Sequence, residues 1–255
     1  MREFLQKIKP SRGFSHVIYL VLNIALPLLV LVLVKTSFVW PAIAIIVISK
    51  WRMFAVRPRF WLANIRTNAI DIIFGLSMLG FMTIAPDDWF QMGFAVLWAV
   101  WLIFIKPRMT VLWVSSQAML GFVAGLMALF ALWPRAPLVV LVTIVGFICF
   151  FAAYHFFYSF DEPHSLLLAY LWAYFGSALA WIMGHWLIFY WIIAQITLIL
   201  VSLALVLGTL YYLDHFDKLS VLVRRQIIFI GIATILIIWS ALVYFHWIHG
   251  SRIVV

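Results

Sequence analysis

The sequence predicts an all-α polytopic transmembrane helical bundle of about nine spans, with eight spans as the alternative. Hydrophobic residues occupy 67% of the 255 positions and charged residues only 10%, whereas soluble domains are about half apolar and a quarter charged. Apolar runs of about 18 residues or more recur along the chain, and each is long enough to cross a bilayer as a helix. We therefore expect residues 1–255 to form a single integral membrane domain.

The individual spans follow from where the apolar runs begin and end. The second run is the least regular, because only residues 36–49 are uncharged and a full crossing must continue through Lys50 and Arg52; a re-entrant segment is the alternative. No Asp, Glu, Lys or Arg lies within residues 165–213, which is too long for one crossing, so the chain is expected to turn at Gly184-His185. The predicted spans are residues 17–34, 36–56, 69–85, 89–105, 109–133, 137–159, 165–183, 186–212 and 226–247.

Two polar pairs have the spacing of helix caps. Asn68 with Asp71, and Asp88 with Gln91, stand three residues apart at the starts of the third and fourth spans, as in a capping box. We expect Asp71 to cap its helix or to pair with Arg66. A carboxylate that couples a proton or cation is the functional alternative, because ionisable groups within a span are expensive to bury.

The basic residues divide unequally between the two sides of the predicted bundle. Nine spans place 14 of the 17 lysines and arginines on one side and three, Lys35, Arg135 and Arg252, on the other. Because basic loops mark the cytoplasmic side, we expect a cytoplasmic N-terminus, an outside C-terminus and a location in the plasma membrane. Residues 1–16 are then a basic cytoplasmic tail.

Residues 50–68 are expected to form a basic amphipathic loop on the cytoplasmic side. The loop alternates cations with aromatic residues, a pattern suited to the headgroup layer of an anionic membrane. It acts either as a general topological anchor or as a specific site for a lipid headgroup. Because the charges follow membrane topology, the basic composition does not indicate nucleic acid as a partner. The candidate headgroup-binding residues are Arg52, Arg57, Arg59 and Arg66.

Two polar segments on the same predicted side combine carboxylates with imidazoles. Oxygen ligands hold Mg²⁺ and a histidine can transfer a proton, so this composition suits a metal-assisted enzyme that modifies a lipid or an isoprenoid. The structural alternative is that these residues cap helices and fill solvated turns. The candidate catalytic residues are His155, Asp161, Glu162, His164, Asp214 and Asp217.

The remaining candidates lie on the outer side or on helix faces. Three histidines on the predicted outer side, His185, His246 and His249, would suit a zinc site if the last span packed beside the turn at residue 185. Gly121 and Gly125 form a small-xxx-small motif, and Gly176-Ser177 with Ala180 offers a similar face. Such faces pack helices within a chain or between the protomers of a homo- or hetero-oligomer.

These patterns favour a non-catalytic membrane protein over an enzyme. The scarcity of charge within the spans indicates a small permease for a neutral or hydrophobic ligand, or a partner in membrane assembly and lipid binding. The alternative is the metal-assisted enzyme described above. The sequence identifies no cofactor.

Overall fold

The computed structural model describes residues 14–190 and 192–249, and for residues 14–16, 52 and 241–249 it describes the backbone alone. Eight helices of this described part are long and apolar enough to cross a membrane, which confirms the predicted all-α polytopic bundle. The chain forms two compact units, Met1–Trp113 (unit 1) and Val114–Val255 (unit 2). That residues 1–255 make one membrane domain stays a prediction.

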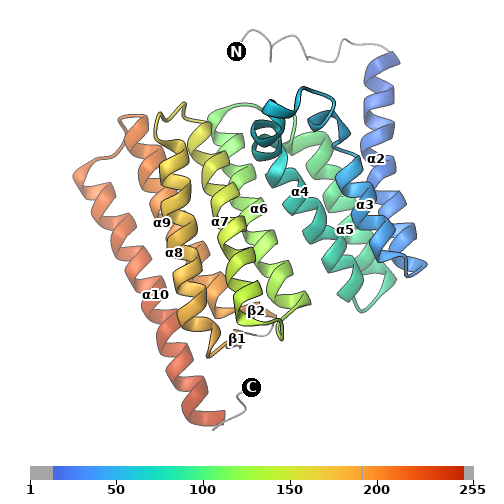
Figure 1. The fold of residues 1–255 in the computed structure, drawn as a ribbon. Helices are drawn as coiled ribbons and strands as arrows, with labels where there is room; N and C mark the ends of the chain where they lie inside the picture. The colour runs from blue at the N-terminus through green and yellow to red at the C-terminus, as the bar shows by residue number, and fades with distance from the viewer. Residues whose placement is uncertain (1–13, 191, 250–255) are drawn as a thin grey trace. The chain divides into compact units, whose positions relative to one another are not determined.

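Unit 1 is built from four apolar helical segments that lie side by side (Figure 1). The first helix, α2 (Phe14–Lys35), contacts α3 (Val39–Ile48), α4 (Trp61–Ile84) and α5 (Asp88–Val100). The last of these continues directly into a π-helical turn, η3 (Trp101–Ile105). Two short 3-10 turns, η1 (Trp51–Met53) and η2 (Pro58–Phe60), connect α3 to α4.

The prediction that residues 36–56 form a full-length span is wrong. The helix in this region, α3, has only ten residues, about 15 Å at 1.5 Å per residue, so it is not among the eight described helices that are long enough to cross a membrane. It stops early because Ser49 Oγ donates to the Ile46 carbonyl and Lys50 turns toward a carboxylate on α4 instead of continuing the helix.

Even so, the chain passes from one end of unit 1 to the other between Lys35 and Lys50. The Lys35 ammonium lies 2.9 Å from the carboxylate of Asp88, the first residue of α5. Lys50 instead shares a carboxylate with Lys106, the residue that follows η3. These ion pairs lie at opposite ends of the 18-residue span Asp88–Ile105, which is about 27 Å long. The short helix α3 therefore returns the chain to the end from which α2 started.

We call the end of unit 1 that carries Lys50, Arg57, Arg59, Lys106 and Arg108 the basic end. The hydroxyl of Tyr19, near the start of α2, donates to the Leu102 carbonyl in η3 at 3.2 Å, so α2 also begins at the basic end. This arrangement agrees with the sides that the charge count assigns within unit 1. Which end is cytoplasmic stays a prediction, as do the sides of residues 1–13 and 250–255, which lie outside the described residues.

Both predicted capping boxes are wrong, because the helices begin at other residues than expected. The helix α4 begins at Trp61, directly after the turn that starts with Pro58, so Asn68 and Asp71 lie well inside it. A proline fixes the backbone angle that a helix start requires. Asp88 is the first residue of α5, and no side chain caps that helix.

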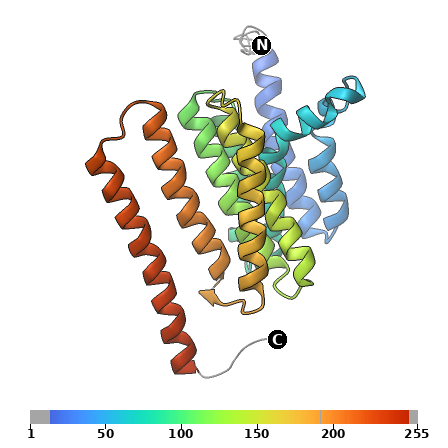
Figure 2. The ribbon, with the colours of Figure 1, turned by 60° about the vertical axis from the view of Figure 1, so that its left-hand side comes forward.

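Unit 2 contains four long helices and all but the first turn of a fifth, α6 (Val111–Leu132). The pair α7 (Leu138–Tyr158) and α8 (Ser165–Gly184) makes the most extensive helix contact, and α10 (Val221–His249) runs antiparallel to α9 (Gln195–His215) (Figure 2). The predicted run 186–212 does not start as a helix. Instead, β1 (Phe189–Tyr190) and β2 (Ile193–Ala194) form a small antiparallel hairpin before α9.

Small residues bring α7 and α8 close together. A Cβ atom added at Gly176 would collide with the Cys149 sulfur, and one at Gly146 would collide with the Ser177 hydroxyl. This confirms that the Gly176-Ser177 face packs against a neighbouring helix. Gly121 and Gly125 are buried in α6, and their predicted role in helix or protomer contacts stays a prediction.

Three helices end with the same backbone motif. Ser37, Asp161 and Asp217 adopt the left-handed conformation, with φ of 63°, 56° and 54°. In each case the N–H of the next residue donates to the carbonyl five residues earlier, as in a Schellman motif. Glycine usually fills this position, and Asp tolerates it better than most other residues.

Candidate functional site

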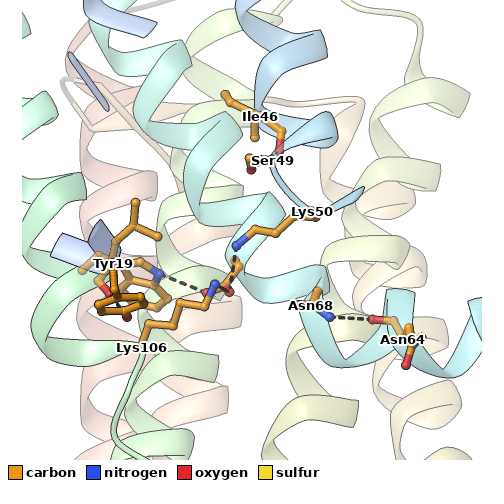
Figure 3. A network of polar contacts seen from close by, with 10 residues as sticks. Tyr19, Ile46, Ser49, Lys50, Asn64, Asn68 and Lys106 are labelled. Atoms are coloured by element: carbon orange, nitrogen blue, oxygen red, sulfur yellow. Dashed lines mark hydrogen bonds and ion pairs between the residues drawn. The ribbon is translucent and has the colours of Figure 1, made fainter. Parts of the chain in front are cut away.

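The most polar interior contact of unit 1 is centred on Asp71, and Figure 3 labels its two lysine partners, Lys50 and Lys106. The Asp71 Oδ2 atom forms ion pairs with Lys50 Nζ at 3.2 Å and with Lys106 Nζ at 2.5 Å. Its other oxygen, Oδ1, accepts a hydrogen bond from Trp101 Nε1 at 3.2 Å. We call Lys50, Asp71 and Lys106 the two-lysine cluster.

Three elements place these side chains together. Asp71 lies on α4, Lys50 follows α3, and Lys106 follows η3, where its N–H closes a π-type hydrogen bond to the Trp101 carbonyl at 2.9 Å. The Trp101 ring stacks on Phe74, one turn after Asp71, with centroids 3.9 Å apart. The π turn therefore directs both the indole N–H and the following ammonium toward one carboxylate. Such turns often mark functional sites.

The two-lysine cluster is poorly exposed and electrically unbalanced. The side chains of Lys50 and Asp71 are 12% and 11% exposed, and that of Lys106 is 32% exposed. Burial lowers the pKa of the Lys50 ammonium to about 8, an effect that Asp71 only partly offsets. For Lys106 burial acts in the same direction, but the Asp71 carboxylate outweighs it and holds the pKa of this ammonium above its ordinary value. Near pH 7 the cluster carries two positive charges and one negative charge.

A stripe of amides on α4 leads from the helix start to Asp71. Asn64 and Asn68 precede Asp71 by seven and three residues, so all three project from one face of the helix. The Asn68 amide donates to the Asn64 carbonyl at 2.9 Å (Figure 3). The Asn64 amide donates to the Met53 carbonyl at 3.3 Å. The stripe thus ties the start of α4 to the turn that follows Lys50.

The connection between α3 and α4 exposes aromatic rings beside arginines. Trp61 donates from its indole to the Val56 carbonyl at 3.0 Å, and its ring meets Phe54 edge to face. The Arg59 guanidinium lies 4.6 Å from the centre of the Phe60 ring. Of the predicted headgroup-binding residues, Arg57 and Arg59 are exposed, Arg66 is half-buried on α4, and the side chain of Arg52 lies outside the description.

The acidic and histidine residues of unit 2 come together only in part. The Tyr211 hydroxyl donates to Glu162 Oε2 at 2.6 Å, and the Phe160 ring lies 4.9 Å from that of His215. The segments 161–164 and 214–217 are therefore neighbours, joined by a phenol and by aromatic packing. His155 lies in the last turn of α7. The exposed members of the predicted set are Asp161, His164, Asp214 and Asp217.

Of the three histidines of the predicted outer site, His185 is the one whose side chain the structure describes. His185 follows α8 and its Nδ1 atom lies 2.8 Å from the Trp181 carbonyl. The side chains of His246 and His249 lie outside the description. Within the residues that the structure describes, no three His, Cys, Asp or Glu side chains are grouped to hold a metal ion.

Sequence reasoning missed the two-lysine cluster. It assigned Asp71 to a cap or to Arg66, and it treated Lys50 and Lys106 only as markers of a membrane boundary. Two features of the sequence could have indicated it. Asp71 is the only carboxylate inside a predicted span, and Lys50 and Lys106 each directly follow an uncharged apolar segment on the basic side of the predicted bundle.

No family model, no curated protein and no solved structure matches this chain.

Proposed function

We propose that this chain is a non-catalytic, multi-pass membrane protein that binds anionic lipid at the basic end of unit 1. The observation that carries the proposal is the α3–α4 connection, where exposed arginines alternate with exposed aromatic rings, one of which, that of Trp61, donates a hydrogen bond to the Val56 carbonyl. Aromatic rings favour the headgroup layer, and arginines attract anionic headgroups. We assign this end to the cytoplasmic side and the protein to the plasma membrane.

The local structure favours lipid over a soluble partner. Trp51, Phe54, Phe60 and Trp61 are all exposed large hydrophobic residues in one short segment. Exposed apolar groups of this size need an apolar environment, and the interfacial zone of a bilayer supplies one beside the phosphate layer. The arginines then lie at the depth where phosphate groups offer bidentate acceptors.

The test is lipid selectivity of the purified protein. We expect native mass spectrometry from mixed micelles of phosphatidylglycerol and phosphatidylcholine to show preferential retention of the anionic lipid. A double variant, Arg57→Gln with Arg59→Gln, should lose most of this preference. The matched control, Arg224→Gln with Arg225→Gln, removes the same charge at the start of α10 and should keep it. Equal retention of both lipids by the wild-type protein would refute the proposal.

A second candidate function, metal-assisted modification of a lipid or isoprenoid, is favoured by one observation. The contact of Tyr211 with Glu162 brings the two acidic segments of unit 2 together. Elemental analysis of purified protein would support this candidate if it found a stoichiometric divalent metal that is lost in Asp214→Asn. The permease, the outer zinc site and oligomer formation stay predictions.

A further inference from the structure

The positive charges of the two-lysine cluster exceed the negative charge available to them. Both ammonium groups approach the same oxygen of Asp71, and among the described residues of unit 1 the other two carboxylates, Asp87 and Asp88, lie at the opposite end. A buried charge without a counterion is costly in a medium of low dielectric constant. The cluster therefore carries one positive charge that no described carboxylate of unit 1 neutralises.

The hydrogen-bonding capacity of the cluster is also incomplete. An ammonium group has three donors, and each lysine directs one toward Asp71. Lys106 keeps about a third of its side chain exposed. Lys106 directly follows the span Asp88–Ile105 and therefore lies at the end of that helical segment. The partly exposed Lys106 ammonium is thus the member of the cluster that an incoming anion would contact first.

The neighbouring stripe on α4 adds neutral polar groups. Asn64 and Asn68 use their amide nitrogens within unit 1, and each side-chain amide also has a carbonyl oxygen. Those oxygens suit the hydroxyls of a glycerol or sugar headgroup but would not attract a second cation away from the lysines. The stripe extends from Asp71 toward the start of α4.

We propose that the two-lysine cluster binds a single phosphate group, supplied by the headgroup of one anionic phospholipid. Lys106 contacts the phosphate directly. The more buried Lys50 attracts it electrostatically without contact, and Asp71 holds the two ammonium groups in place. The inference rests on the proposed function, and it names a specific site and ligand group within it. The exposed arginines hold several lipids loosely, whereas the cluster holds one lipid firmly.

The test counts the lipids that survive increasing collision energy in native mass spectrometry of the full chain. We expect wild-type protein with phosphatidylglycerol to keep one lipid after the others have left. Lys106→Gln should weaken retention of that last lipid by about tenfold or more, because a hydrogen bond to a charged group is lost. Lys106→Arg should restore it. Lys35→Gln is the matched control, since it removes a lysine paired with Asp88 at the opposite end.

These variants distinguish general binding of anionic lipid at the basic end from binding of one lipid at the two-lysine cluster. Loss of the last lipid in Lys106→Gln, with unchanged retention in Lys35→Gln, supports the cluster as the site. If Lys106→Gln does not keep its melting temperature, Lys50→Gln provides the same comparison. A general preference for anionic lipid that depends only on Arg57 and Arg59 would overturn the cluster while leaving the proposed function intact.

Free phosphate is the other source of the same chemistry. We expect 10-fold excess inorganic phosphate over lipid to leave the last phosphatidylglycerol bound, because the acyl chains contribute to its retention. Displacement of that lipid by inorganic phosphate in the wild-type protein, but not in the lysine variants, would overturn the assignment to a lipid headgroup.

Discussion

The two units stabilise their half-buried carboxylates in opposite ways. In unit 1, Asp71 is surrounded by two ammonium groups and an indole N–H. In unit 2, Glu162 accepts a hydrogen bond from the neutral Tyr211 hydroxyl within a group of aromatic rings. The remaining acidic residues near Glu162 are exposed, and two of them occupy left-handed positions at helix ends.

The Asp71 carboxylate of unit 1 holds neighbouring elements together, whereas the exposed carboxylates of unit 2 lie at helix ends. Removing Asp71 leaves two cations facing each other in a poorly hydrated site. Removing an exposed carboxylate from unit 2 leaves a position that water can fill. We therefore expect the two-lysine cluster to contribute more to the free energy of unfolding than the exposed carboxylates of unit 2 do.

The largest effect is expected from Asp71→Ala. Breaking a buried ion pair by removing one partner typically lowers stability by about 3–5 kcal/mol, and here both lysines lose their only described carboxylate. The melting temperature in detergent should fall sharply, whereas Asp214→Ala, at an exposed position of unit 2, should change it little. Equal effects of the two substitutions would contradict the comparison.

A glycine pair tests the packing around the two-lysine cluster. A Cβ at Gly75 on α4 would lie 2.9 Å from the ring of Trp98, which is almost fully buried. We therefore expect Gly75→Ala to lower the free energy of unfolding by about 1–3 kcal/mol through overpacking. In unit 2 the nearest atoms to a Cβ at Gly208 are 3.7 Å away, so Gly208→Ala should be neutral or stabilising. Thermal unfolding of both variants in one detergent checks the contrast.

The sequence was sufficient to predict the helices that obey bilayer physics. Long apolar runs with charged ends predicted the eight spans that the structure describes. The prediction failed where the length and hydropathy of a segment do not distinguish a full span from a short helix or a hairpin. Residues 36–49 are uncharged and could begin a span that continues through Lys50 and Arg52, but the helix there has only ten residues. The strands Phe189–Tyr190 and Ile193–Ala194 are as apolar in the hairpin as they would be in a helix.

The site was less predictable, because its residues meet only through tertiary packing. Asp71 and Lys50 are 21 positions apart, and their contact requires the chain to turn back through a short helix that the sequence did not identify. The Asp161 and Asp217 positions were also hidden, since left-handed helix ends are usually glycine. Arg57 and Arg59 are easier to place from the sequence, because they belong to one short connection and are exposed; their role in lipid binding stays a prediction.

The pH dependence of stability gives a smaller test of the two-lysine cluster. Because the folded-state pKa of Lys50 is lowered to about 8 from 10.5, the unfolded state binds more protons between these values. Stability should therefore rise as the pH increases from 8 to 10, by on the order of 1 kcal/mol. Lys106 does not oppose this rise. Because its pKa is raised above 10.5, the stabilisation that its charged form provides is lost only above pH 10.

Melting curves at pH 8, 9 and 10 would measure this effect. Lys50→Gln should remove the rise, and Lys35→Gln should keep it, since Lys35 lies at the opposite end of unit 1. A wild-type melting temperature that falls steadily over this range, in parallel with Lys50→Gln, would contradict the assigned role of Lys50.

The smallest effect is expected at the helix ends of unit 2, and it distinguishes a structural carboxylate from a metal ligand. Asp217 has a φ of 54°, a conformation that glycine adopts without strain. Asp217→Gly should therefore leave stability unchanged or raise it by up to about 1 kcal/mol, whereas Asp217→Val should lower it, because a β-branched residue is strained there. If Asp217 were instead a ligand of a bound divalent metal, both variants would lose the metal and its stabilisation. A melting temperature that rises or holds in Asp217→Gly, in buffer with or without chelator, therefore favours the helix-end role and weakens the case for an enzyme in unit 2.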